Sequence, residues 1–280
     1  MMRLYELTDN FGWAIILFAI VVALVLLPFM AKSKKSMMRM TRLQPRMMEL
    51  QKKHEGNPQK LNEEMARLYR ENKVSPMGGC LWSLLPLFIM IALYRAVVKP
   101  LTIMMGIPDD MLQQGGAIYE QLQNLGYSLS NYTSSANSFY EQIYQAKFIT
   151  ENWDAFRGIS DNLVQMNFNF VGLDLSVTPD WHFWSFDLSA GAWPVIGLFI
   201  MPLISTGLNY LSMFISRKLQ PSVGTTQQQQ ASASSMKTMM IIMPLMSLWI
   251  GYVMPAALCV YWIMNSLTGI IREVGLTLLY

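Results

Sequence analysis

Residues 31–73 read AKSKKSMMRMTRLQPRMMELQKKHEGNPQKLNEEMARLYRENK, and this basic, methionine-rich stretch lies between two strongly apolar ones. The chain has 280 residues, of which 52% are hydrophobic and only 14% are charged. Soluble domains carry about 25% charged residues. The composition therefore predicts a membrane protein, in which the basic stretch is an insert exposed to water.

Five apolar stretches are candidate membrane spans, because a helix needs about 20 apolar residues to cross a hydrocarbon core of about 30 Å. They are Trp13–Ala31, Cys80–Val98, Trp193–Met213, Met239–Val253 and Ala256–Ile271. Lysines follow the first stretch where a signal-peptide cleavage site needs small residues, so we expect it to be retained as a span. The last two stretches are short and nearly contiguous, which favours a tight helical hairpin. The predicted fold class is an all-α membrane protein with five transmembrane helices.

The charge distribution predicts the orientation in the membrane. Residues 32–73 hold 12 Lys and Arg and 5 Asp and Glu, whereas residues 100–192 hold 2 and 10. Basic loops stay in the cytoplasm, so we expect the N-terminus outside and the C-terminus in the cytoplasm. The predicted segments are 1–31 (outer N-terminus and first span), 32–77 (cytoplasmic insert), 78–99 (second span), 100–192 (extracytoplasmic) and 193–280 (spans three to five, with a disordered cytoplasmic loop at about 219–235).

The insert has the pattern of a helical hairpin. Apolar side chains recur at spacings of three and four in two runs, and each run is one face of a helix. Gly56 ends the first run, Asn57 is a good N-cap, and Pro58 suits the first position of a second helix. We therefore predict two antiparallel amphipathic helices in the cytoplasm. Their apolar face consists of Met37, Met40, Leu43, Met47, Leu50, Leu61, Met65 and Leu68.

This hairpin has two interpretations. It can pack only on itself, as charged hairpins commonly do. Its apolar face, however, is rich in methionine, a flexible side chain suited to varied partners. Its basic face suits anionic lipid headgroups or ribosomal RNA. No motif that reads bases is present, so we expect no sequence-specific nucleic-acid partner.

Several motifs occur in a fixed order along the chain. They are Leu27-Pro28, Leu43-Gln44-Pro45, Leu61-Asn62, Leu68-Tyr69, Pro76-Met77-Gly78-Gly79-Cys80, FNFVGLDLS at residues 168–176, Met243-Pro244-Leu245, and Tyr261-Trp262 with Asn265. In this order and spacing they resemble the YidC-type membrane protein insertases, a family that includes the mitochondrial oxidase-assembly and chloroplast Albino insertases. The resemblance covers residues 11–99 and 166–273.

The resemblance implies a multi-pass protein of the bacterial plasma membrane that helps hydrophobic segments of new proteins to enter and fold in the bilayer. It implies a hydrophilic groove that is open to cytoplasm and lipid and closed to the outside, with the hairpin meeting the incoming chain. The implied partners are nascent membrane proteins and membrane lipids, with a ribosome and a Sec-type translocon as further candidates. No nucleotide hydrolysis is implied.

The sequence departs from the family at two groove positions. Ala23 stands where the family has a basic residue, five positions before Pro28, and Pro86 stands where a glutamine is common. The candidate groove residues are Ala23, Ser83, Thr206, Asn209, Ser247, Tyr261 and Asn265, with Ser205 and Ser266 as further polar residues of the spans. Each of these polar side chains is equally suited to an interhelical hydrogen bond.

Other functional classes have less support. The sequence has no metal-ligand spacing, phosphate loop or nucleophile motif, so we expect no enzyme, catalytic residue, metal or cofactor. A small transporter or channel is an alternative, although transporters normally place ionisable residues inside their spans. An assembly scaffold that does not translocate its partners is another. The final part of the outer region, VTPDWHFWSFDLSAGAWP at residues 177–194, is interpreted as an interfacial segment whose tryptophans lie at the lipid headgroups. The alternative is that the region is a variable spacer with loose helices.

Overall fold

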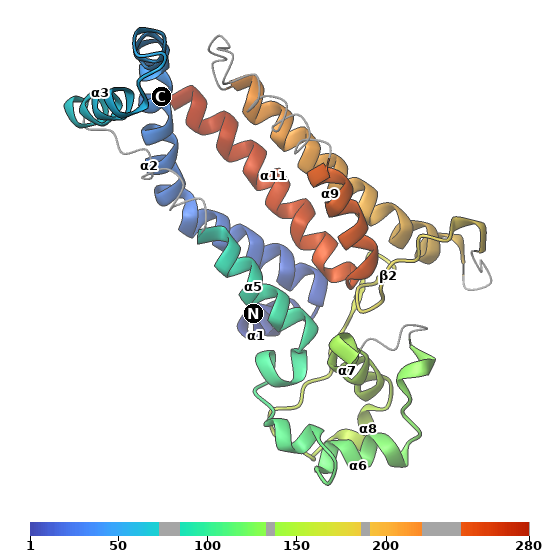
Figure 1. Cartoon of the computed structure of the whole chain (residues 1–280). Coiled ribbons are helices and arrows are strands. Elements are labelled where there is room, and N and C mark those ends of the chain that lie inside the picture. The colour runs from blue at the N-terminus through green and yellow to red at the C-terminus, as the bar shows by residue number, and fades with distance from the viewer. Residues whose placement is uncertain (73–84, 133–137, 186–190, 220–241, 280) are drawn as a thin grey trace.

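The computed structural model describes residues 1–72, 85–132, 138–185, 191–219 and 242–279 (Figure 1). This part of the chain is mostly helical, as predicted. Within it, two helices are long and apolar enough to cross a membrane, α2 (Phe11–Lys53) and α9 (Ala192–Leu219). Two further apolar helices, α5 (Leu85–Val98) and Ile242–Val253, are shorter. The predicted second and fourth spans begin outside the described residues. Most of the predicted loop at 219–235 also lies outside them.

The first span and the first half of the insert form one continuous helix, which the sequence did not lead us to expect. Helix α2 has 43 residues and contains Pro28 and Pro45. The Asn10 side chain accepts hydrogen bonds from the backbone N–H groups of Gly12 and Trp13 and so caps the start of this helix. Because lysine, methionine and arginine are good helix formers, the basic stretch extends the helix beyond residue 31 instead of ending it.

Helix α3 (Pro58–Glu71) begins where the sequence predicted. The Asn57 side chain accepts a hydrogen bond from the backbone N–H of Lys60 at 3.1 Å, and Pro58 is the first helical residue. Helix α3 contacts α2. Leu43 and Leu68 are buried in the two helices, and the Tyr69 hydroxyl lies 3.8 Å from the Met47 sulfur. The two apolar faces therefore meet in part.

Helices α2, α9 and α11 (Ala256–Leu279) form the centre of the molecule. Helix α11 contacts both of the others, and Figure 1 shows it between them. All three helices begin at the same end of this bundle, where the strands β1 (Asn169–Phe170) and β2 (Leu173–Asp174) also lie. The strands pair antiparallel, with Asn169 opposite Asp174 and Phe170 opposite Leu173.

The described part of the 100–192 region is packed and is therefore not a loose spacer, whereas the placement of its tryptophans at the headgroups stays a prediction. Ile118, Leu122, Ile143 and Phe156 are fully buried in a core that is shared with Tyr5 near the N-terminus. Burial of this kind is what distinguishes a folded unit from a loose spacer. The elements around this core are α1 (Met2–Thr8), the π-helix η1 (Pro100–Met104), η2 (Asp109–Leu112), α6 (Ala117–Asn124), η3 (Leu129–Asn131), η4 (Ser138–Tyr140), α7 (Glu141–Glu151), α8 (Trp153–Phe156) and η5 (Phe183–Ser185).

Candidate functional site

The predicted groove residues come from four helices. Ala23 is half-buried on α2, and the next residue, Leu24, has 64% of its surface exposed. Ser247 is half-buried on the helix Ile242–Val253, and Ser83 lies outside the described residues. Thr206 and Asn209 lie on α9, with Thr206 half-buried and Asn209 exposed, while on α11 Tyr261 is buried and Asn265 is exposed.

Among the residues that the structure describes, Ser266 and Asn209 lie close together. The Ser266 hydroxyl donates to the Asn209 side-chain oxygen at 3.3 Å and so joins α11 to α9. One turn earlier on α9, the hydroxyl oxygens of Ser205 and Thr206 are buried, and neither has a hydrogen-bond partner among the described residues. An unpaired buried hydroxyl is costly and uncommon. This face of α9 is therefore chemically suited to a water molecule or to a polar group of another chain.

An ion pair that the sequence analysis missed joins α2 to α11. Lys34 is 7% exposed, and its ammonium group contacts the Glu273 carboxylate. The two residues are separated by 239 positions. Opposite charge near the ends of two spans is the only signal in the sequence, and it would match many other pairs equally well. Lys34 is buried and the Glu273 side chain is 19% exposed, so removing one partner would leave a poorly solvated charge between the helices.

The residues predicted for the apolar face of the hairpin differ in their burial. Leu43 and Leu68 are buried at the contact of α2 with α3. Met40, Met47, Leu50, Leu61 and Met65 are half-buried, and Met37 is 47% exposed. The contact between the helices thus leaves an accessible methionine-rich surface beside it.

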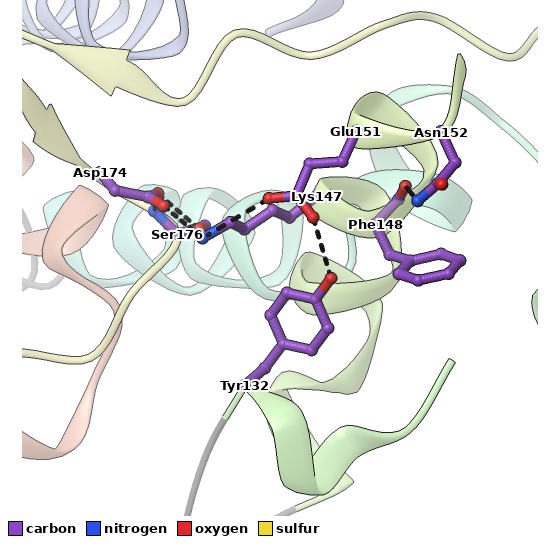
Figure 2. A network of polar contacts seen from close by, with 7 residues as sticks. All are labelled: Tyr132, Lys147, Phe148, Glu151, Asn152, Asp174 and Ser176. Atoms are coloured by element: carbon purple, nitrogen blue, oxygen red, sulfur yellow. Dashed lines mark hydrogen bonds and ion pairs between the residues drawn. The ribbon is translucent and has the colours of Figure 1, made fainter. Parts of the chain in front are cut away.

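A polar network joins α7 to the end of β2 (Figure 2). Lys147 Nζ lies 2.6 Å from Asp174 Oδ2, and Asp174 Oδ1 accepts from the Ser176 hydroxyl at 2.5 Å. The Tyr132 hydroxyl donates to Glu151 at 3.0 Å. Burial, together with this bond to Glu151, raises the pKa of Tyr132 above its ordinary value, so the phenol stays protonated and donates.

This network borders a cavity of about 450 Å³. Its lining includes Asp9, Lys147, Glu151 and Asp174, together with amide side chains from residues 165–169. The acidic character of the region was visible in the sequence, but the position of Lys147 among these carboxylates was not. Across the described ranges, no group of His, Cys, Asp and Glu residues is arranged to hold a metal ion.

Comparison with known proteins gives the same family along the whole chain. The model of the family described as "60Kd inner membrane protein" matches residues 3–277. A protein of Syntrophobacter fumaroxidans named "Membrane protein insertase YidC" is 28% identical over 269 residues, which are 96% of this chain and 35% of that protein.

Shorter matches are more similar. Proteins of the same name from Ralstonia nicotianae and Helicobacter pylori are 42% and 43% identical over 97 and 94 residues, or 35% and 34% of this chain. These matches cover 18% and 17% of the two proteins. The chain thus spans about a third or less of the length of these curated relatives. Because the family model extends over nearly all of its residues, the chain belongs to the 60Kd inner membrane protein family, the YidC-type family that its motifs resemble.

Proposed function

We propose that the chain is a membrane protein insertase and chaperone, which helps hydrophobic segments of newly made proteins to enter and fold in the bilayer without hydrolysing nucleotide. The observation that carries this proposal is the family match over residues 3–277. Relatives that are similar over up to 96% of this chain are named membrane protein insertases.

In the proposed topology the chain crosses the bacterial plasma membrane five times, through the first part of α2, α5, α9, the helix Ile242–Val253 and α11. The N-terminus and the 100–192 region are outside, and the hairpin and the C-terminus are in the cytoplasm. The opposite net charges of the insert and the 100–192 region support this orientation. Trp13 and Trp193 support the placement of the first and third spans, because tryptophan prefers the headgroup level and each lies near the start of a candidate span.

The proposed mechanism is a shortened path through hydrocarbon. Each unsatisfied backbone group in lipid costs several kcal/mol, so polar parts of an incoming chain need polar surroundings part of the way. The Ser205 and Thr206 hydroxyls and the Asn209–Ser266 pair supply such surroundings on α9 and α11. Burial of the apolar segment of the substrate in lipid then drives insertion. The groove candidates of this proposal are Ala23, Ser83, Thr206, Asn209, Ser247, Tyr261 and Asn265.

The hairpin is the proposed receiving surface for nascent chains. Its methionines remain accessible beside the contact of α2 with α3, and methionine adapts to side chains of varied shape. Arg39, Arg42 and Arg46 are exposed on the same stretch, which places positive charge where anionic headgroups or a ribosome would approach. A Sec-type translocon is a further proposed partner.

A photo-crosslinker tests this role. Placed at Met47 or Met65 during translation of a membrane protein, it is expected to capture the nascent chain. The same crosslinker at Gln123, which is exposed in the 100–192 region, is expected to capture none. Products are identified by mass and by antibody to the substrate. Crosslinks at Met47 and Met65 that join only α2 to α3 would show that the hairpin packs on itself and receives nothing.

A further inference from the structure

The β1–β2 hairpin is seated on two glycines at the start of two candidate spans. A methyl group at Gly12 of α2 would lie 2.3 Å from the Phe170 ring, and one at Gly197 of α9 would lie 2.5 Å from the Leu173 side chain. Both distances are far below a van der Waals contact, so only glycine allows the strands to approach this closely. The hairpin therefore fills the space between the beginnings of α2 and α9.

The chain on either side of the hairpin accepts hydrogen bonds from the first turns of two helices. The Phe11 N–H donates to the Asn167 carbonyl at 2.9 Å. At the start of α11, the Ala256 and Ala257 N–H groups donate to the carbonyls of Val177 and Leu175 at 2.9 and 3.1 Å. N–H groups in the first turn have no partner inside their own helix, so one segment, residues 167–177, satisfies such groups on both α2 and α11.

A side chain of α7 contacts this segment on the side that faces away from the bundle. Asp174 ends β2, and its Oδ2 contacts Lys147 Nζ at 2.6 Å (Figure 2). Lys147 lies on α7, where Ile143 and Ile149 are fully buried in the core of the region. Its side chain is 23% exposed. The Tyr132 ring lies 5.7 Å from the ammonium group. A buried helix therefore presents the cation to the hairpin from a fixed position.

We propose that Lys147 is a positioning residue that clamps the β1–β2 hairpin into the end of the bundle and keeps that end closed. The inference rests on the proposed function, which places the 100–192 region outside the membrane and supplies the groove that the hairpin would close. It gives the packed helices of the 100–192 region a role in insertion. They hold the β1–β2 hairpin in place, and the hairpin separates the groove from the outside.

The test measures access to the bundle from outside the cell. The reporter is Ala19→Cys in a chain that also carries Cys80→Ala and Cys259→Ala. Ala19 is 3% exposed and lies two turns along α2 from Gly12, on the same face. A membrane-impermeant thiol reagent should label this cysteine slowly in intact cells. Adding Lys147→Ala is expected to raise the rate about tenfold, because a partly buried charge-assisted bond is lost.

Matched variants separate a clamp from general loss of structure. Lys147→Arg keeps the cation and should keep labelling slow. Arg157→Ala removes an exposed cation of the same region and should change nothing. If Lys147→Ala lowers the thermal stability of the purified protein but leaves the labelling rate unchanged, the ion pair only stabilises the fold and the clamp is refuted.

Inverted membrane vesicles distinguish failure of the clamp from failure of the proposed function. Labelling of Ala19→Cys from the cytoplasmic side supports a groove that is open to the cytoplasm. If that labelling occurs while Lys147→Ala has no effect from the outside, only the clamp is refuted. If the cysteine is labelled from neither side in any variant, position 19 stays dry with or without Lys147 and the clamp is refuted, whereas the proposed function fails only if the purified chain inserts no substrate into vesicles.

Discussion

Lys34→Met is expected to lower the free energy of unfolding by up to roughly 3–5 kcal/mol, the cost of removing one partner of a fully buried ion pair. The physical reason is that Glu273 would remain between α2 and α11 as a carboxylate without its cation. Since whole proteins are stable by only about 5–15 kcal/mol, much of the folded protein should be lost. Denaturant unfolding of the purified variants in mixed micelles measures the effect.

The double variant Lys34→Met with Glu273→Met is the decisive comparison. Replacing both charges with apolar side chains removes the unpaired group, and such replacements are often neutral or stabilising. We therefore expect the double variant to regain most of the lost stability. Arg39→Met serves as the control because Arg39 is exposed on the same helix. Losses that simply add in the double variant would contradict a direct energetic coupling of the two residues.

Arginine at two adjacent positions of α2 is expected to have different effects on the amount of folded protein. In lipid, arginine at the centre of a span costs about 2.5–3.5 kcal/mol on insertion scales. Leu24 is largely exposed on the bundle surface, so Leu24→Arg should sharply reduce the amount of folded protein. In the proposed groove the guanidinium group keeps its water, so Ala23→Arg should accumulate normally.

The measurement is the amount of monodisperse protein extracted in detergent, with wild type and Leu24→Ala as references. Ala23→Arg is also expected to improve insertion of substrates with acidic outer tails, because the added charge would attract them. An equal loss of protein for both arginine variants would mean that residue 23 faces lipid or tight packing, and the groove would lose its position on α2.

The sequence predicts features that depend on neighbouring residues. The helical class, the Asn57 cap and the start of α3 at Pro58 each follow from a few consecutive side chains, and the structure confirms all three. The end of the first helix could not be predicted in this way. The lysines that signal the edge of the membrane are also good helix formers, so α2 continues through them.

Features made by distant residues could not be predicted. The partners of Lys34 and Lys147 lie 239 and 27 positions away, and a single sequence does not distinguish them from other acids. FNFVGLDLS was recognised only by its resemblance to the family. Its strands are two residues each, too short for a periodic pattern. The need for glycine at position 12 arises only when Phe170 is packed against it.

Insertion by the purified chain is the most direct test of the proposed function. The chain is incorporated into lipid vesicles, a small membrane protein with one hydrophobic segment is translated in their presence without an energy source for the vesicles, and the inserted fraction is measured by protection from protease. We predict that vesicles with the chain protect the substrate's hydrophobic segment and its translocated tail in amounts that rise with the amount of chain, well above vesicles of the same lipids alone. Equal protection in the two kinds of vesicle would contradict an insertase function for this chain.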